Sequence, residues 1–178
     1  MKIMRKNSGF TMVELFVTMA VMSILAATAI PQLMVVIPNY ELRSVSRDMF
    51  SHLQLAKLTA VKRNADCAIT FTKGSGDVIS GYTVYMDFNK NFKHDTDSGE
   101  EVITSVDWTE KNKNNVKCDE VTFNNNDDNL PTVVFPSIGI PKDPGGNGNG
   151  TVSLSNKNGL KTDVVVSRAG NVRIKKVK

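Results

Sequence analysis

The chain begins with a long apolar stretch that contains a single charge. Residues 10–30 read FTMVELFVTMAVMSILAATAI, and Glu14 is the one charged position among these 21 residues. At 1.5 Å per residue they would form about 31 Å of helix, which is enough to cross a bilayer core of about 30 Å. The pattern predicts a membrane-spanning helix over residues 10–38, with Pro31 as a kink and Pro38 as a second kink or break.

A second helical pattern follows in residues 39–66. Its apolar positions recur at steps of three and four, which is the period of an amphipathic helix. Together with the membrane segment it predicts one helix of about 50 residues, and the apolar stripe is expected to cover a sheet. A stripe that binds a partner protein is the alternative. The stripe consists of Leu42, Val45, Met49, Leu53, Ala56 and Ala60.

The rest of the chain has the pattern of short strands separated by turns. Segments that alternate or are β-branched favour strands, and stretches rich in Asn, Asp, Gly and Pro favour loops. Two such polar stretches, residues 110–129 and 141–150, predict loops. The sequence therefore predicts an α+β protein, a long helix packed on an antiparallel β-sheet domain. The predicted strands are residues 67–72, 82–88, 101–107, 132–135, 151–155, 163–167 and 171–174.

The composition of the chain argues against several classes of function but does not identify one. The chain has 178 residues, a net charge of +4, two cysteines and two histidines. That length suits one domain, and so few Cys and His residues argue against a zinc centre or a His-based triad. No nucleophile elbow, zinc-protease or phosphate-loop motif occurs, so we expect no enzyme. Three of the basic residues, Lys2, Arg5 and Lys6, precede the apolar stretch, and the positive-inside rule places residues 1–9 in the cytoplasm.

Glu14 decides between three interpretations of the N-terminus. An ordinary signal peptide is supported by the A-x-A sequence at residues 27–29 and would release a soluble periplasmic binding domain after Ala29. An uncleaved membrane anchor is the second possibility. Neither explains a carboxylate inside the apolar stretch, where an acid costs a few kcal/mol and indicates a function.

The third interpretation rests on the segment KNSGFTMVE at residues 6–14. It resembles the type III signal of type IV pilins and pseudopilins. The resemblance implies that a prepilin peptidase cuts after Gly9 and methylates the new amine of Phe10. It also implies that Glu14 is the assembly residue, which neutralises the Phe10 amine of a neighbouring subunit in the filament core. In the same family a helix-kinking proline often stands where Pro31 does.

The C-terminal half resembles the GspH/FimT branch of minor pilins and minor pseudopilins. The matching order is F-x-x-x-G at 135–139, G-T-V-x-L at 150–154, an apolar strand, and G-x-V-R at 170–173. The resemblance implies an inner-membrane, single-pass subunit whose C-terminal domain lies in the periplasm. Its partners would be prepilin peptidase and other pilins, in a type II secretion pseudopilus or a type IV pilus, at or near the tip. The predicted regions are a leader at 1–9, a helix at 10–38 and a globular domain at 39–178.

An acidic loop at the end of the second predicted strand is a candidate calcium site. Its first oxygen-bearing side chains have the 1, 3, 5 spacing of a calcium-binding loop. The sixth position is Phe92 and the twelfth is Ser98, so the rest of that pattern fails. A solvated hairpin loop is the favoured interpretation and calcium the alternative; no other cofactor is expected. The candidate ligands are Asp87, Asn89, Asn91, Asp95, Asp97 and Glu100.

The two cysteines, Cys67 and Cys118, are candidates for a disulfide. Under the expected topology both lie in an oxidising compartment, where a bridge can persist. It would close a loop of about 50 residues and stabilise the fold by about 4 kcal/mol in the chain-entropy model. Two buried thiols are the alternative.

The C-terminal tail is basic and carries no acid after Asp163. Some FimT-type minor pilins bind DNA through a basic C-terminal region, so DNA binding for uptake is an alternative function. A solvated edge strand whose cations prevent aggregation is the other interpretation. The candidate DNA contacts are Arg168, Arg173, Lys175, Lys176 and Lys178.

Overall fold

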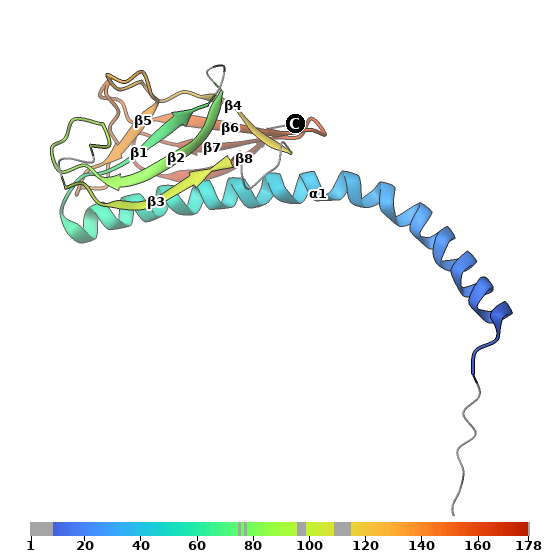
Figure 1. The fold of residues 1–178 in the computed structure, drawn as a ribbon. Coiled ribbons are helices and arrows are strands. Elements are labelled where there is room, and N and C mark those ends of the chain that lie inside the picture. The colour runs from blue at the N-terminus through green and yellow to red at the C-terminus, as the bar shows by residue number, and fades with distance from the viewer. Residues whose placement is uncertain (1–8, 75, 77, 96–98, 109–114, 178) are drawn as a thin grey trace, which may run out of the picture. The chain divides into compact units, whose positions relative to one another are not determined.

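The computed structural model describes the chain except residues 1–8, 75, 77, 96–98, 109–114 and 178 (Figure 1). Within these residues one helix, α1 (Met12–Arg63), is followed by eight strands. The 52-residue length of α1 confirms the predicted long helix, and neither Pro31 nor Pro38 ends it. The strands are β1 (Cys67–Lys73), β2 (Ile79–Met86), β3 (Val102–Asp107), β4 (Val116–Val121), β5 (Thr132–Phe135), β6 (Gly150–Asn156), β7 (Lys161–Val166) and β8 (Val172–Val177).

The chain divides into two compact units, residues 1–37 and residues 38–178. The first unit contains the membrane part of α1 and no strand among its described residues. The second unit contains the rest of α1 and all the strands named above. The division lies one residue from the predicted boundary at 38/39.

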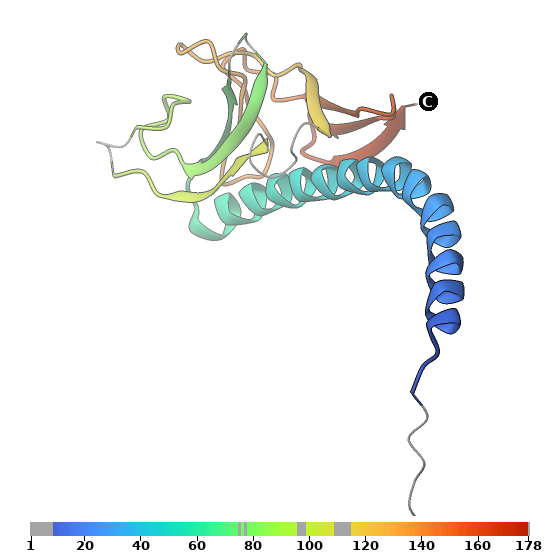
Figure 2. The ribbon, with the colours of Figure 1, turned by 45° about the vertical axis from the view of Figure 1, so that its right-hand side comes forward.

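The strands form two antiparallel sheets of four. The first has the order β3-β2-β1-β5 and the second the order β4-β6-β7-β8. Figures 1 and 2 both show the second part of α1 running beside these sheets. The prediction of a helix on antiparallel β-structure is confirmed, although the single sheet that was expected is divided in two.

The apolar stripe of α1 forms one wall of the core. Its six predicted positions are all buried, and Met49, Leu53, Ala56 and Ala60 have no exposed surface. The period of 3.6 residues turns these side chains toward one side, where they meet alternate residues of the strands. The alternative of a partner-binding stripe is therefore wrong, because the chain's own sheets cover it. The strand residues in this core include Ile69, Phe71, Tyr82, Val84, Phe135, Val152, Leu154 and Val164.

Strand β4 corrects the prediction that residues 110–129 form a loop. Val116 and Cys118 are buried and Lys117 between them is exposed, which is the alternation of a strand with one face on a core. The strand pairs with β6 in antiparallel register, with Cys118 opposite Leu154. Its polar composition hid the pattern, because only the inward face needs apolar side chains.

Candidate functional site

The described chain enters α1 through Gly9, Phe10 and Thr11. Thr11 caps the helix, because its Oγ1 accepts a hydrogen bond from the backbone N–H of Glu14 at 3.3 Å. The backbone N–H of Leu15 also donates to the Thr11 carbonyl oxygen, at 3.2 Å. A Thr followed three residues later by Glu is the capping-box spacing, a signal that could have identified this residue from sequence. The cap makes the helix start at the residues that the pilin resemblance singles out.

No contact within the described chain requires a glycine at position 9. A Cβ atom added to Gly9 would meet nothing within 4 Å, and its φ is not in the left-handed region. Gly81, in contrast, is required by the fold, because an added Cβ atom would lie 2.1 Å from the Val106 carbonyl oxygen. The contacts of the described residues therefore do not explain a glycine at this position.

The membrane part of α1 is apolar and is not buried in the structure. The helix contains an 18-residue window with a mean hydropathy of 2.1, of which none is buried. The core helix of a soluble protein would have an equally apolar window, but a mostly buried one. The large apolar side chains at residues 10–37 are all about half exposed or more, so they need lipid or other subunits to cover them.

Glu14 is the one acid of this membrane part. Three hydroxyl groups later in the same part are already hydrogen-bonded within the helix, because each donates to a backbone carbonyl three residues earlier. Thr18 donates to Leu15 at 2.8 Å, Ser23 to Ala20 at 2.8 Å and Thr28 to Leu25 at 2.9 Å. Glu14 has no such internal partner for its carboxylate in the part of the chain that is described.

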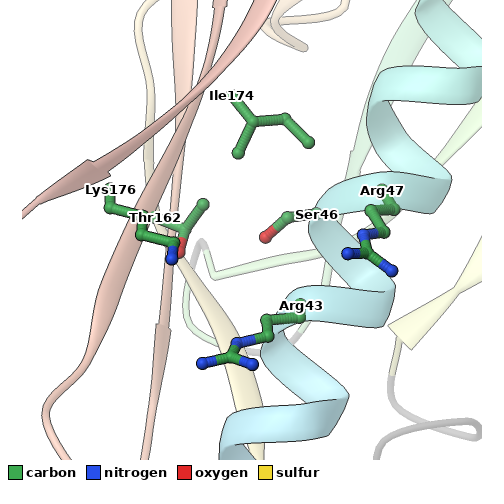
Figure 3. A pocket seen from close by; sticks show the side chains of 6 residues that line it. All are labelled: Arg43, Ser46, Arg47, Thr162, Ile174 and Lys176. Carbon is green, nitrogen blue, oxygen red and sulfur yellow. The ribbon is translucent and has the colours of Figure 1, made fainter.

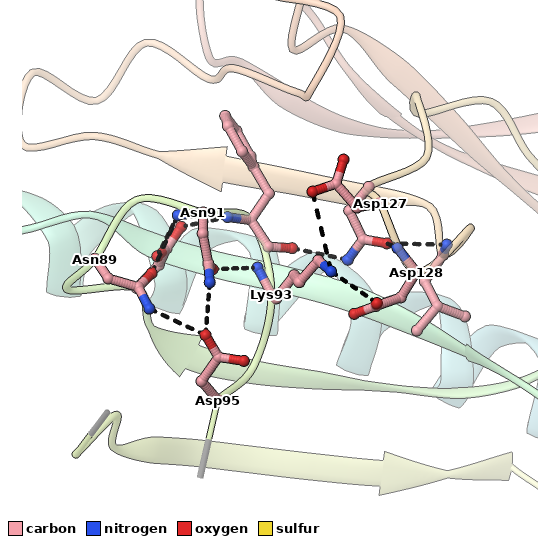
Figure 4. A network of polar contacts seen from close by, with 10 residues as sticks. Asn89, Asn91, Lys93, Asp95, Asp127 and Asp128 are labelled. Atoms are coloured by element: carbon pink, nitrogen blue, oxygen red, sulfur yellow. Dashed lines mark hydrogen bonds and ion pairs between the residues drawn. The ribbon is translucent and has the colours of Figure 1, made fainter. Parts of the chain in front are cut away.

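The predicted calcium loop is a network of polar contacts (Figure 4). Asp87 is buried, and its carboxylate oxygens accept the backbone N–H groups of Asn91 and Phe92, each at 3.2 Å. The side-chain amides of Asn89 and Asn91 both donate to Asp95 Oδ2, at 3.0 and 2.5 Å. The oxygens of these residues thus bind N–H groups of the loop itself.

These contacts also set the protonation of the loop's acids. The amides of Asn91 and Asn89 lower the pKa of Asp95, whereas burial raises the pKa of Asp87 and of Glu100. Lys93 fixes the loop to the next polar segment, with its Nζ 2.8 Å from Asp128 Oδ1 and 3.9 Å from Asp127 Oδ2.

Among the described residues, no group of three or more His, Cys, Asp or Glu side chains is placed to hold a metal ion. Asp97, one of the predicted ligands, lies outside the described residues. Calcium binding at this loop stays a prediction.

The cysteines are free thiols in the structure, so the expected disulfide is not formed there. Cys67 begins β1 and Cys118 lies in β4, and these strands belong to different sheets. Both side chains are packed into the same apolar core, and this burial raises the pKa of each thiol to about 12. A thiol with so high a pKa reacts slowly, because the thiolate is the reactive form.

The basic tail does not form one cationic face. Alternation along β8 places Arg173 and Lys175 on one side of the sheet and Lys176 on the other. Arg168 lies in the turn before β8, where its guanidinium donates to the side-chain oxygens of Asn147 and Asn149 at 3.1 and 3.2 Å. Lys178 lies outside the described residues. The predicted DNA contacts are thus divided between two faces and a turn.

Comparisons with known proteins agree with the arrangement of helix and sheets. The family model "Type II transport protein GspH" matches residues 45–170, and the model "Prokaryotic N-terminal methylation motif" matches residues 4–30. Among solved structures, two crystal forms of the type IV minor pilin FimU from Pseudomonas aeruginosa have the same fold. A search of the curated proteins found no match.

The two FimU structures are distant in sequence. The P21 form has 14% identity and a TM-score of 0.56, covering 79% of this chain and 95% of that one. The P65 form has 12% identity and a TM-score of 0.53, covering 76% of this chain and 97% of that one. At such low identity the likeness establishes the fold.

The fold, the capped apolar helix and the methylation motif define a type IV pilin-like subunit, a structural class whose members assemble. The chain belongs to the GspH family, since that model covers more than half of it. Its role is that of a minor pilin or minor pseudopilin, and its apolar N-terminal helix is a membrane anchor. The leader motif implies processing by prepilin peptidase and contact with other pilins.

Proposed function

We propose that the chain is made as a precursor that spans the inner membrane once, with residues 1–9 in the cytoplasm and residues 39–178 in the periplasm. Prepilin peptidase cuts between Gly9 and Phe10 and methylates the Phe10 amine. The mature subunit then joins a type II secretion pseudopilus or a type IV pilus at or near the tip, through residues 10–38. Pro31 bends that helix in the filament.

The observation that supports this proposal is the methylation motif at residues 4–30. Glu14 lies within that motif and is the one acid of the apolar part of α1, whose most apolar window is not buried. Cleavage creates a positive amine at Phe10, and Glu14 of a neighbouring subunit is the matching charge. A paired charge in an apolar filament core costs far less than a lone one. Release after Ala29 would discard Glu14 and leave it without a purpose.

Incorporation into filaments tests the role of Glu14. We expect Glu14→Gln to remain inserted and processed but to be lost from filaments sheared off cells that express the assembly system. Glu120→Gln is the matched control, since it removes the same charge from an exposed position of β4. The proposal fails if Glu14→Gln enters the filaments in the wild-type amount, or if both variants are lost equally.

A further inference from the structure

A recessed basic pocket lies between the second part of α1 and the second sheet (Figure 3). It has a volume of about 340 Å³. Arg43 and Arg47 reach it from the helix, and Lys176 reaches it from β8. Its remaining lining residues are Ser46, Thr162 and Ile174, so no acidic side chain is among them.

The backbone geometry brings these cations together. Arg43 and Arg47 are four residues apart in α1, so they share one face of the helix. Thr162 of β7 and Lys176 of β8 are directly opposite in the antiparallel register, so their side chains share one face of the sheet. Figure 3 shows this face turned toward the helix residues.

The three cations and the threonine hydroxyl of the pocket lack partners among the described residues. Within the described part of the chain, Arg43, Arg47 and Lys176 form no ion pair and no side-chain hydrogen bond. Thr162 is only 8% exposed, and its hydroxyl also has no hydrogen-bond partner there. Like charges at positions i and i+4 of a helix destabilise it slightly, and a bound anion would relieve this repulsion.

The donors suit a phosphate group. Two guanidinium groups, an ammonium group and a hydroxyl offer N–H and O–H donors from different directions, as the oxygens of a phosphate require. The Ser46 hydroxyl is already used, since it donates to the Leu42 carbonyl oxygen at 2.7 Å. Ile174, which is 40% exposed, adds an apolar wall beside the cations.

The position along the chain selects the source of the phosphate. Arg43 is the sixth residue after Ile37, the last residue of the first unit. Six residues span at most about 20 Å even when fully extended, so the pocket stays near the end of the membrane segment in every arrangement of the two units. The anions of highest density at that distance from a bilayer are lipid headgroups.

We propose that Arg43, Arg47, Thr162 and Lys176 bind the phosphate of an anionic phospholipid while the subunit is still in the membrane. The inference rests on the membrane anchoring of the subunit, not on its incorporation into filaments. A nucleic acid is the less favoured ligand, because Arg173 and Lys175, which would extend the track of cations, face the other side of the sheet.

Native mass spectrometry of the full chain in detergent tests this directly. The probes are phosphatidylglycerol and phosphatidylcholine with identical acyl chains, added in equal amounts. We expect wild type to retain phosphatidylglycerol preferentially. Lys176→Gln should weaken that binding about fivefold, and the double variant Arg43→Gln/Arg47→Gln about 25-fold.

Lys175→Gln is the matched control, because it removes the same charge from the adjacent residue on the opposite face. It should leave the lipid preference unchanged, and the fluorescence of Trp108 in denaturant shows whether each variant is folded. Equal losses in Lys175→Gln and Lys176→Gln would overturn the proposal, since binding would then follow net charge.

Competition separates the sources of phosphate. Displacement of the lipid by an oligonucleotide would assign the pocket to nucleic acid, and displacement by an equal concentration of inorganic phosphate would assign it to a free anion. Either result overturns the proposal. A wild type that enters filaments but shows no lipid preference refutes this inference alone. One that prefers phosphatidylglycerol but never enters filaments refutes the proposed function alone.

Discussion

The two parts of α1 are both regular helix, but the side chains of the first part are exposed and the apolar stripe of the second part is buried. Up to Ile37 none of the most apolar window is buried, whereas after Pro38 the stripe from Leu42 to Ala60 is enclosed by both sheets. The first part is apolar around its whole circumference and the second part along one stripe only. The difference shows that one helix can have two kinds of packing partner. The second part packs against the sheets of its own chain, whereas the first part is left to pack against lipid or other subunits.

Leu53→Ala should have the largest effect on the globular unit. Leu53 is fully buried, and truncation of such a side chain costs about 2–5 kcal/mol of unfolding free energy, because it leaves a cavity. Leu25→Ala is the same change in the membrane part, where Leu25 is 63% exposed, and should leave the unfolding free energy of this unit unchanged. Denaturant unfolding followed by Trp108, which lies in the globular core, measures both. Equal effects would contradict the division between the two parts.

Lys57→Met should have the next largest effect. Lys57 Nζ donates to the Gly170 carbonyl oxygen at 2.9 Å, which ties the helix to the turn between β7 and β8. Loss of this bond leaves the carbonyl without its partner and should cost about 1–3 kcal/mol. Lys62→Met removes an equal charge from the last turn of α1 and should change stability little. The same unfolding measurement compares them, and a larger loss in the control would contradict the role of Lys57.

Asn39→Ala should have a smaller effect at the start of the packed part. Its Oδ1 accepts the side-chain amides of Asn156 and Asn158, at 2.7 and 3.0 Å. Both bonds are made to one acceptor atom and the Asn158 bond is exposed, so removing that atom should cost about 0.5–1.5 kcal/mol in all. Hydrogen exchange of the Asn156–Leu160 turn should accelerate with it, and unchanged exchange would show that the turn does not depend on the helix.

The pH dependence carried by Arg63 and Glu101 should be the smallest effect. Hydrogen bonding to the Arg63 guanidinium lowers the pKa of Glu101 below its usual value of 4.5. The pair therefore stabilises the folded state above that value, and the contribution is lost as the pH falls through the lowered pKa. Glu101→Gln should be slightly less stable than wild type at neutral pH and equal to it once the pH is below the lowered pKa of Glu101. Both residues are exposed, so a large difference would contradict the assignment.

Local patterns predicted the parts of the fold that depend on neighbouring residues. The 3.6-residue period predicted the six apolar positions of the α1 stripe, because that period decides which side chains share a face. It did not predict Ser46, a polar residue that is also buried. The division into two sheets was not predicted, since strand pairing depends on contacts far apart in sequence. Strand β4 was missed because Lys117, Asp119 and Glu120 face solvent and mask its two buried residues.

The same distinction holds for the sites. Gly9, Phe10 and Glu14 could be named as candidates from the sequence because their spacing in one segment carries the signal. The pocket was not, because Arg43 and Lys176 stand at opposite ends of the globular unit in sequence and meet only through the packing of helix and sheet. Thr11 is an intermediate case. Its three-residue spacing to Glu14 is a helix-capping signal in the sequence, but the cap was not predicted from it.

The mature N-terminus is the most direct test of the account. Mass spectrometry of the protein taken from native membranes should find a chain that begins at an N-methylated Phe10 and retains Glu14. That result would establish prepilin processing. A chain that begins at Ile30 would contradict the account, because the apolar part of α1 and Glu14 would then be absent from the mature protein.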